Sequence, residues 1–147
     1  MIVLLPPAAT PSADPILDIL KSCKTIAVVG ISPKKFRPSN EIAAYLLDAG
    51  YKVYAVNPNE KEVLGLPCYS RIEDIAGEVD VVDIFRKAED VGPVVDGAIR
   101  KRAKVVWMQQ GIENREAAEK ALAAGLTVVM DACILIEHRK RLAALAT

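Results

Sequence analysis

The chain has 147 residues, which is the size of one domain and is enough to bury a hydrophobic core. Apolar residues make up 52% of it and charged residues 26%, and 19 basic side chains balance 19 acidic ones. This balance excludes a general electrostatic attraction to nucleic acid or to an acidic membrane surface. Any basic patch therefore has to be local.

The cysteines Cys23, Cys68 and Cys133 lie far apart in the sequence. No pair of them has the spacing of zinc ligands, and an odd number does not suit a disulfide framework. We therefore expect reduced thiols, no bound metal and a cytoplasmic protein.

Residues 1–13 are briefly apolar and then Pro-rich, and we expect them to form a mobile leader in front of a single domain over 14–147. They lack the cationic segment and the long apolar segment of a secretory signal. No window of the chain approaches the roughly 18 apolar residues of a membrane span, so no contact with a membrane is expected.

The rest of the chain alternates between two patterns. Continuous apolar runs indicate buried strands, and apolar residues three or four positions apart, between capping residues and Gly or Pro, indicate helices. In chain order the expected elements are a short helix capped by Ser12 or Asp14, a strand over 25–29, a helix from Pro38 to about Gly50, a strand over 51–56, a short strand near 67–69, a strand over 79–85, a helix over 91–99, a strand over 104–108, a helix over 114–124, a strand over 126–130 and a helix over 133–145.

Repeated strand-then-helix units predict a parallel sheet with helices on both faces. Right-handed crossovers make an open sheet the simplest arrangement. We therefore predict an α/β, Rossmann-like, doubly wound and mostly parallel sheet of five strands, or of six with the short strand near 67–69. In such sheets ligands bind beyond the carboxyl ends of the strands, where the strand order reverses.

The loop after the first long strand carries the most informative motif. Gly30 is followed by Ile31, Ser32, Pro33, Lys34, Lys35, Phe36 and Arg37 and then by a helix. A dinucleotide fingerprint would place glycine again at positions 32 and 35, where this chain has a hydroxyl and a cation. Backbone N–H groups at a helix start attract anions, and the extra cations favour a ligand with more than one pyrophosphate's charge. The alternative is a solvated basic loop.

The second strand ends at Asn57-Pro58, where an NAD-binding domain usually has Asp or Glu to bind the ribose. A neutral amide in a rigid turn can instead flank an adenine, although Asn-Pro is also a common turn initiator. Phe85 and Arg86 end a later strand and offer an aromatic face and a charge. These residues are interpreted either as ligand contacts or as an ordinary surface cluster.

The fourth long strand ends in Gln109, Gln110, Gly111 and Ile112, and amides there suit an amide-bearing ligand or simply satisfy the loop backbone. Catalytic groups are scarce. His138 is interpreted as a surface residue of a charged helix, and Asp80 and Asp83 as structural residues within a strand. Cys133 is interpreted as a buried structural thiol at the ligand-facing edge of the last strand.

Several blocks together carry a resemblance to a known family. The chain resembles the small CoA-binding-domain proteins, which are related to the CoA-binding N-terminal domain of the succinyl-CoA synthetase alpha subunit. The resemblance spans about residues 15–142 and rests on blocks at 27–32, 37–39, 50–58, 82–86, 106–111 and 128–133.

The resemblance implies a Rossmann-like fold that binds coenzyme A, or a short acyl-CoA, at the strand ends. It places Gly30, Ser32, Lys35 and Arg37, with Ile31 in the same loop, around the phosphates, Asn57 and Pro58 beside the nucleotide, Phe85 and Arg86 on its other side, and Gln110, Gly111 and Ile112 along the pantetheine arm. Family members often have Arg where this chain has Ala132, so that side chain's role does not carry over. The synthetase's phosphorylated histidine lies in a domain missing here, and His138 does not replace it.

We therefore predict a small-molecule nucleotide-binding protein that carries or senses CoA and has no catalytic residues of its own. The sequence leaves open whether it catalyses any reaction. The sequence leaves open an NAD(P)-binding oxidoreductase or redox sensor, a CoA-linked thiol redox protein that uses Cys133, and an interaction module with a vestigial pocket. It also leaves open a homodimer or an unidentified protein partner.

Overall fold

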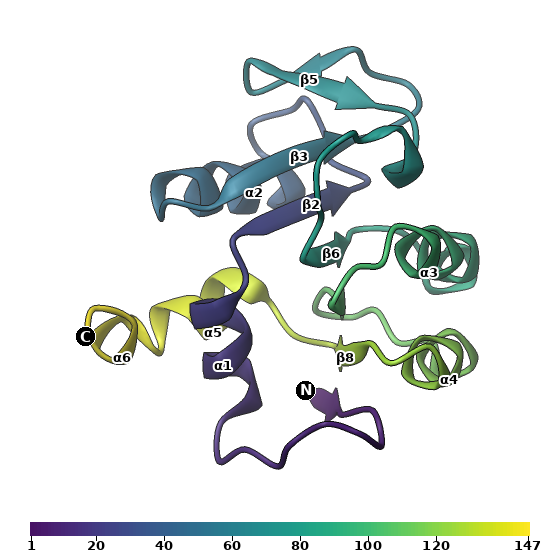
Figure 1. Ribbon diagram of the computed structural model, residues 1–147. Helices are drawn as coiled ribbons and strands as arrows, with labels where there is room; N and C mark the ends of the chain where they lie inside the picture. The colour runs from purple at the N-terminus through teal and green to yellow at the C-terminus, as the bar shows by residue number, and fades with distance from the viewer.

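The computed structural model describes residues 1–147 (Figure 1). Its strands are β1 (Ile2–Leu4), β2 (Thr25–Val29), β3 (Lys52–Val56), β4 (Glu62–Val63), β5 (Leu66–Tyr69), β6 (Val81–Ile84), β7 (Val105–Met108) and β8 (Thr127–Met130). Its helices are α1 (Pro15–Ser22), α2 (Pro38–Asp48), α3 (Val91–Arg100), α4 (Arg115–Ala123), α5 (Ile134–Arg139) and α6 (Leu142–Leu145), with short 3₁₀ turns η1 (Ile72–Asp74) and η2 (Ala88–Asp90).

The strands form one sheet in the order β1-β8-β7-β6-β2-β3-β5-β4. Neighbouring strands from β8 to β5 are parallel, and β1 and β4 are antiparallel at the two edges. The chain leaves β2 toward β3 and then crosses to β6 on its other side, so the strand order reverses beside β2. The predicted doubly wound, mostly parallel α/β fold is confirmed, and the switch point lies at the carboxyl end of β2.

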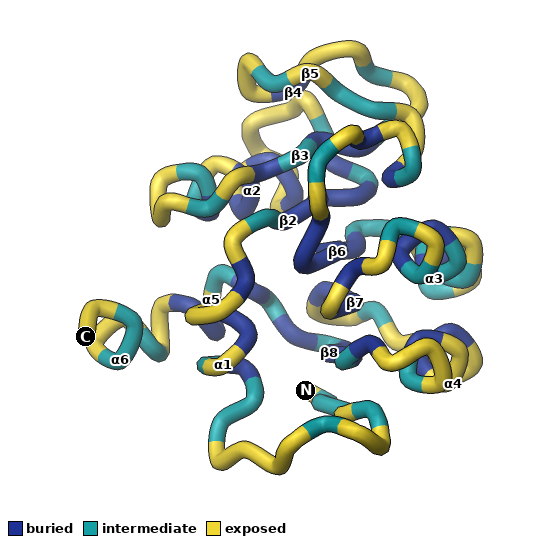
Figure 2. The backbone as a smooth tube through the Cα atoms, in the orientation of Figure 1, coloured by how far each residue is buried: buried dark blue, intermediate teal, exposed yellow.

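Both faces of the sheet are covered, which explains why its strands are continuously apolar. Alternate residues of β2 point to opposite sides: Ala27 and Val29 pack with α3 and α4, and Ile26 and Val28 pack with α1, α2 and α5. Figure 2 shows the central strands as buried chain between these helix layers. A strand with both faces buried needs apolar residues at every position.

The edges of the sheet hold strands that the sequence analysis did not predict. Residues 2–4, expected in a leader outside the domain, pair antiparallel with β8 from Ile2 opposite Met130 to Leu4 opposite Val128. This apolar strand covers an edge that would otherwise leave β8 with unpaired N–H and C=O groups. At the other edge β4 and β5 form a hairpin, whose two turn residues, Leu64 and Gly65, both have positive φ, as a tight turn of this kind requires.

The C-terminal segment also differs from the prediction, because the helix expected over 133–145 is divided into α5 and α6. At the break Arg141 turns its guanidinium toward Asp14 at the start of α1, with Nε 2.9 Å and Nη2 3.1 Å from the carboxylate oxygens. No helix of the chain combines the length and the apolar character needed to cross a bilayer.

Candidate functional site

The carboxyl ends of β2, β3, β6 and β7 surround three adjoining cavities, which we call cavities 1, 2 and 3. Gly30 stands between the first two, at the switch point. Its φ is +87°, and a Cβ built there would lie 2.5 Å from the carbonyl oxygen of Phe85. Only glycine therefore allows the end of β2 to pass so close to the end of β6.

Cavity 2 has a volume of about 360 Å³ and lies over the loop after β2 and the start of α2. It is lined by Gly30, Ser32, Lys34, Arg37, Pro38, Ser39 and Phe85. No side chain caps the N-terminus of α2, whose first helical residue is Pro38. Two cations and an uncapped helix start thus face the same space, which suits an anion.

The loop that bears these cations is folded back onto α2. The Ser32 N–H donates to the Ser39 hydroxyl at 2.9 Å, and the Asn40 side-chain amide donates to the Ser32 carbonyl oxygen at 2.8 Å. Ser39 and Asn40 are both buried, and the Ser32 hydroxyl accepts from the N–H of Lys34 at 3.1 Å. These contacts hold the backbone of the loop, while the side chains of Lys34 and Arg37 remain free of ion pairs.

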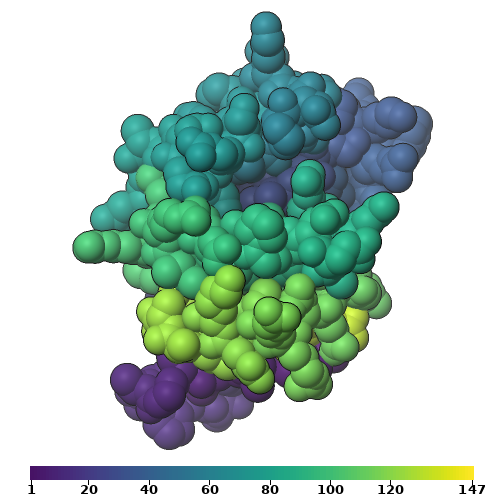
Figure 3. Space-filling model, turned by 90° about the vertical axis from the view of Figure 1, so that its right-hand side faces the viewer, coloured from purple at the N-terminus to yellow at the C-terminus, as the bar shows by residue number.

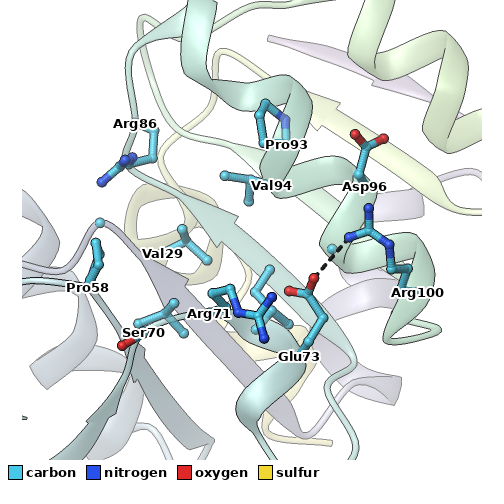
Figure 4. A pocket seen from close by; sticks show the side chains of 14 residues that line it. Val29, Pro58, Ser70, Arg71, Glu73, Arg86, Pro93, Val94, Asp96 and Arg100 are labelled. Atoms are coloured by element: carbon cyan, nitrogen blue, oxygen red, sulfur yellow. Dashed lines mark hydrogen bonds and ion pairs between the residues drawn. The ribbon is translucent and has the colours of Figure 1, made fainter.

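Cavity 1, of about 350 Å³, lies on the α3 side of β2. It is lined by Val29, Gly30, Val56, Pro58, Ser70, Arg71, Ile72, Glu73, Arg86, Pro93, Val94, Asp96, Gly97 and Arg100. Figure 4 shows Arg86 and Pro58 on one side of this space and the ion pair of Arg100 with Glu73, 2.9 Å long, on the other. In the space-filling view of Figure 3 a hollow lies between α3 and the β3–β5 part of the surface.

Cavity 3, of about 430 Å³, lies between α2 and the ends of β6 and β7. It is lined by Pro38, Ile42, Phe85, Arg86, Gln109, Gln110, Ile112 and Cys133. Gln109 is 5% exposed, and its side-chain oxygen accepts from the N–H of Ile134 at 3.1 Å.

The three cavities adjoin one another and share lining residues, and we refer to them together as the groove. Gly30 belongs to cavities 1 and 2, Arg86 to cavities 1 and 3, and both Pro38 and Phe85 to cavities 2 and 3. The end of β6 is therefore the centre of the groove. A ligand with its charged part at cavity 2 has room to extend to either side.

Most residues that the sequence analysis placed at the site line this groove. They are Gly30, Ser32, Arg37, Pro58, Phe85, Arg86, Gln110 and Ile112. The other four lie elsewhere. Ile31 is fully buried in the core, Lys35 is exposed outside the cavities, and the N–H of Gly111 donates to Asp131 at 2.7 Å. The side-chain amide of Asn57 donates to the carbonyl oxygen of Ile31 at 2.8 Å and thus holds the backbone of the loop after β2.

The structure adds a wall that the sequence analysis missed. Ser70, Arg71 and Glu73 come from a weakly patterned stretch, and Pro93, Asp96 and Arg100 from the exposed side of α3. The polar side of a helix looks the same in sequence whether it faces solvent or a cavity. The only available signal was the run of polar residues directly after the short strand near 67–69.

Three titratable residues away from the groove, His138, Asp80 and Asp83, are buried in the fold. His138, expected at the surface, is 7% exposed, and its Nδ1 lies 2.7 Å from the Tyr45 hydroxyl. Burial lowers the pKa of His138. Asp80 accepts from the N–H groups of Lys24 and Thr25, as a structural residue does. Asp83 is fully buried and neither carboxyl oxygen has a hydrogen-bond partner, so desolvation raises its pKa well above the usual range.

Fold and groove together define a Rossmann-like domain with its candidate site at the switch point. Residues 24–139 match the model of the family described as CoA binding domain, and the chain belongs to this family. The resemblance inferred from the sequence blocks is thereby confirmed.

The chain is also similar to individual proteins of known sequence or structure. The uncharacterized protein YneT of Bacillus subtilis is 39% identical over 128 residues, which cover 87% of this chain and 95% of YneT. A solved hypothetical protein from Pyrococcus horikoshii is 47% identical, with a TM-score of 0.85 over 86% of this chain and 89% of that one. The ADP-forming acetate–CoA ligase I of Archaeoglobus fulgidus is 35% identical over 76% of this chain but only 18% of the ligase. The chain therefore corresponds to one domain of that larger enzyme.

Proposed function

We propose that this protein binds coenzyme A, free or as a short acyl-CoA, in the groove formed by cavities 1, 2 and 3. The observation that carries the proposal is that three adjoining cavities meet at a basic, uncapped helix start at the switch point. Membership of the CoA binding domain family supports the same ligand.

The chemistry of each cavity suits a different part of this ligand. Lys34 and Arg37 beside the start of α2 suit the pyrophosphate. Cavity 1 combines the apolar walls of Val29 and Val94 with arginines, which suits an adenine ring and the phosphate on its ribose. Cavity 3 is lined by Gln109 and Gln110, whose side chains suit the amides of a pantetheine arm.

The proposed role is that of a carrier or sensor in the cytoplasm, without a reaction of its own. No general base stands beside Ser32, whose hydroxyl already accepts from the loop backbone. His138 packs against Tyr45 and Tyr51 and lines none of the three cavities. A domain that binds CoA without reacting with it is suited to store the cofactor or to deliver it to another protein.

The test compares a groove cation with a cation outside the groove. Arg37 lines cavity 2, whereas Lys61 is exposed and lines none of the three cavities. If Arg37 makes one charge-assisted contact to a phosphate, Arg37→Ala weakens CoA binding by about 1.5–3 kcal/mol, and Lys61→Ala leaves it unchanged. Isothermal titration of each variant with CoA and with dephospho-CoA measures its loss of binding free energy. Equal losses for the two variants would overturn the assignment of the basic loop.

A nicotinamide dinucleotide is the main rival ligand. Asn57 is a poor ribose clamp because its amide is committed to the carbonyl oxygen of Ile31. Saturating ligand raises the melting temperature by mass action, so a thermal-shift comparison of CoA, NADH and NADPH separates the two classes. Stabilisation by NADH or NADPH without stabilisation by CoA would refute the proposal.

A further inference from the structure

Two carboxylates line cavity 1, and their surroundings differ. Asp96 on α3 forms a 2.8 Å ion pair with Lys120 of α4, and Figure 4 shows its carboxylate turned away from Val29. Glu73 on η1 accepts a 2.9 Å hydrogen bond from Arg100 of α3 through Oε2, and its Oε1 accepts none from the protein. Glu73 therefore has one oxygen held by the protein and one that is free to accept from a ligand.

The helix α3 fixes the place of this free oxygen. A Cβ built on Gly97 would lie 2.8 Å from Oε1 of Glu73, so a larger residue there would push the carboxylate away from the helix. Arg100, which holds the other oxygen, lies three residues further along α3 and therefore on the same face. Gly97, Arg100 and Glu73 all line cavity 1, so Oε1 has a defined position at its wall.

Much of the remaining wall of cavity 1 is apolar. Val29 and Val56 end the neighbouring strands β2 and β3, Ile72 lies in η1, and all three are at most 6% exposed. Val94 adds an apolar side chain from α3. Apolar side chains suit the faces of a flat ring, whereas an ionised carboxylate accepts hydrogen bonds at the edge of such a ring. Cavity 1 therefore suits an aromatic ring with an N–H donor on its edge.

The nucleotide half of CoA has two donors from which a carboxylate can accept, the 6-amino group of adenine and the free 2′-hydroxyl group of the ribose. The hydroxyl group lies next to the 3′-phosphate, and a carboxylate repels that charge. The phosphates are expected beside Arg37 and Arg86, and Figure 4 shows Arg86 on the opposite side of cavity 1 from Glu73. The amino group of adenine is therefore the donor that fits Glu73.

From these observations, and resting on the proposed binding of CoA, we propose that Glu73 determines the base specificity of the groove. Its Oε1 accepts a hydrogen bond from the 6-amino group of adenine, while the ring lies against the apolar wall of cavity 1. The ligands of this class are adenine nucleotides. A nucleotide with a carbonyl oxygen at position 6 is rejected, because that oxygen would face the carboxylate oxygen with no proton between them.

The experiment compares CoA with its hypoxanthine counterpart, in which a carbonyl oxygen replaces the 6-amino group. Isothermal titration of the wild-type protein should show at least about tenfold tighter binding of CoA. In Glu73→Gln the amide oxygen faces the guanidinium of Arg100, which only donates, so the NH2 group faces the cavity. This variant should bind the hypoxanthine compound at least as tightly as CoA, because the amide donor matches the carbonyl oxygen. A merely structural role of Glu73 would weaken the binding of both compounds alike.

Asp96→Asn is the matched control, because it removes the same charge from the same cavity and leaves Glu73 in place. It should keep the preference of the wild type for CoA. Equal binding of both compounds by the wild type, a preference for CoA retained in Glu73→Gln, or its loss in Asp96→Asn would refute the role of Glu73 alone, since CoA still binds in each case. If CoA binds to none of the three proteins, the proposed function itself is refuted.

Discussion

The side-chain amide of Asn57 donates a 2.8 Å hydrogen bond to the carbonyl oxygen of Ile31, which ties the end of β3 to the loop after β2. Its side-chain oxygen accepts from the N–H of Asn59 at 2.9 Å and shapes the turn at Pro58. One residue therefore joins the two loops that flank the entrance to the groove.

Loss of this tie should destabilise the protein and loosen the basic loop. Asn57→Ala is expected to lower the free energy of unfolding by about 1–2 kcal/mol, because a partly buried carbonyl oxygen loses its donor. Asn59→Ala is the control, since only the backbone of Asn59 takes part in the turn. Urea denaturation of the two variants measures the difference. Equal stability of Asn57→Ala and the wild type would contradict a supporting role.

Gly30 and Gly111 have nearly the same backbone conformation but different surroundings. Substituting each of them therefore distinguishes the cost of a positive φ from the cost of a steric clash. Gly30 and Gly111 have φ values of +87° and +86°, but an added Cβ meets the Phe85 carbonyl oxygen at Gly30 and nothing within 4 Å at Gly111. Gly111→Ala should cost about 1–2 kcal/mol, the price of a left-handed alanine. Gly30→Ala should cost at least about 1 kcal/mol more, because β2 and β6 have to separate. Thermal denaturation compares them, and similar losses would show that the close approach is unimportant.

Asp83 and Asp80 should respond to pH in opposite directions. Burial raises the pKa of Asp83, so the folded protein holds a proton that the unfolded chain releases above about pH 4. At low pH the Asp83 carboxyl is neutral in both states and lowers the free energy of unfolding little. As pH rises toward the pKa of the folded state, keeping this carboxyl protonated lowers the free energy of unfolding more and more. Asp83→Asn should therefore gain stability relative to the wild type as pH rises from about 4 toward neutrality.

The Asp80 carboxylate shows the reverse behaviour. Burial opposes its ionisation, but the N–H groups of Lys24 and Thr25 and the charge of Lys104 outweigh burial and lower its pKa. Its contribution is present above about pH 4 and is lost as pH falls through the lower folded pKa. Asp80→Asn should thus be less stable than the wild type at neutral pH and approach it in acid. Chemical denaturation across pH tests both variants, and parallel curves for the two would contradict these assignments.

Arg141 joins the C-terminal segment to the first helix. It contacts both oxygens of Asp14 and also lies 3.0 Å from the Glu137 carboxylate, whose side chain is 8% exposed. Arg141→Met should destabilise the protein by about 1–3 kcal/mol, because the buried Glu137 charge loses its main partner. Arg115→Met, at an exposed arginine without an ion pair, is the control. Equal melting temperatures of the two variants would argue against this connection.

The elements that the sequence predicted well are those whose pattern arises from burial on both faces. Strands β2 and β6 are apolar at almost every position, and α3 repeats valine at helical spacing. The short strands β1 and β4 carry too few residues for a pattern, and they exist because partners at the sheet edges satisfy their backbone. Pairing between distant segments cannot be read from either segment alone.

The amino-acid sequence by itself determined the parallel α/β fold and the basic loop that follows Gly30, because each of these depends on local patterns and short-range chirality. The strand order, and with it the switch point beside β2, came from the tertiary structure. Only the tertiary structure decided which side chains face the groove. It turned Ile31 and Asn57 away to the core and the backbone, buried His138 beside Tyr45, and brought Arg71 and Arg100 to one cavity. The reason is that a side chain's direction depends on how neighbouring elements pack, and that packing joins residues far apart in the chain.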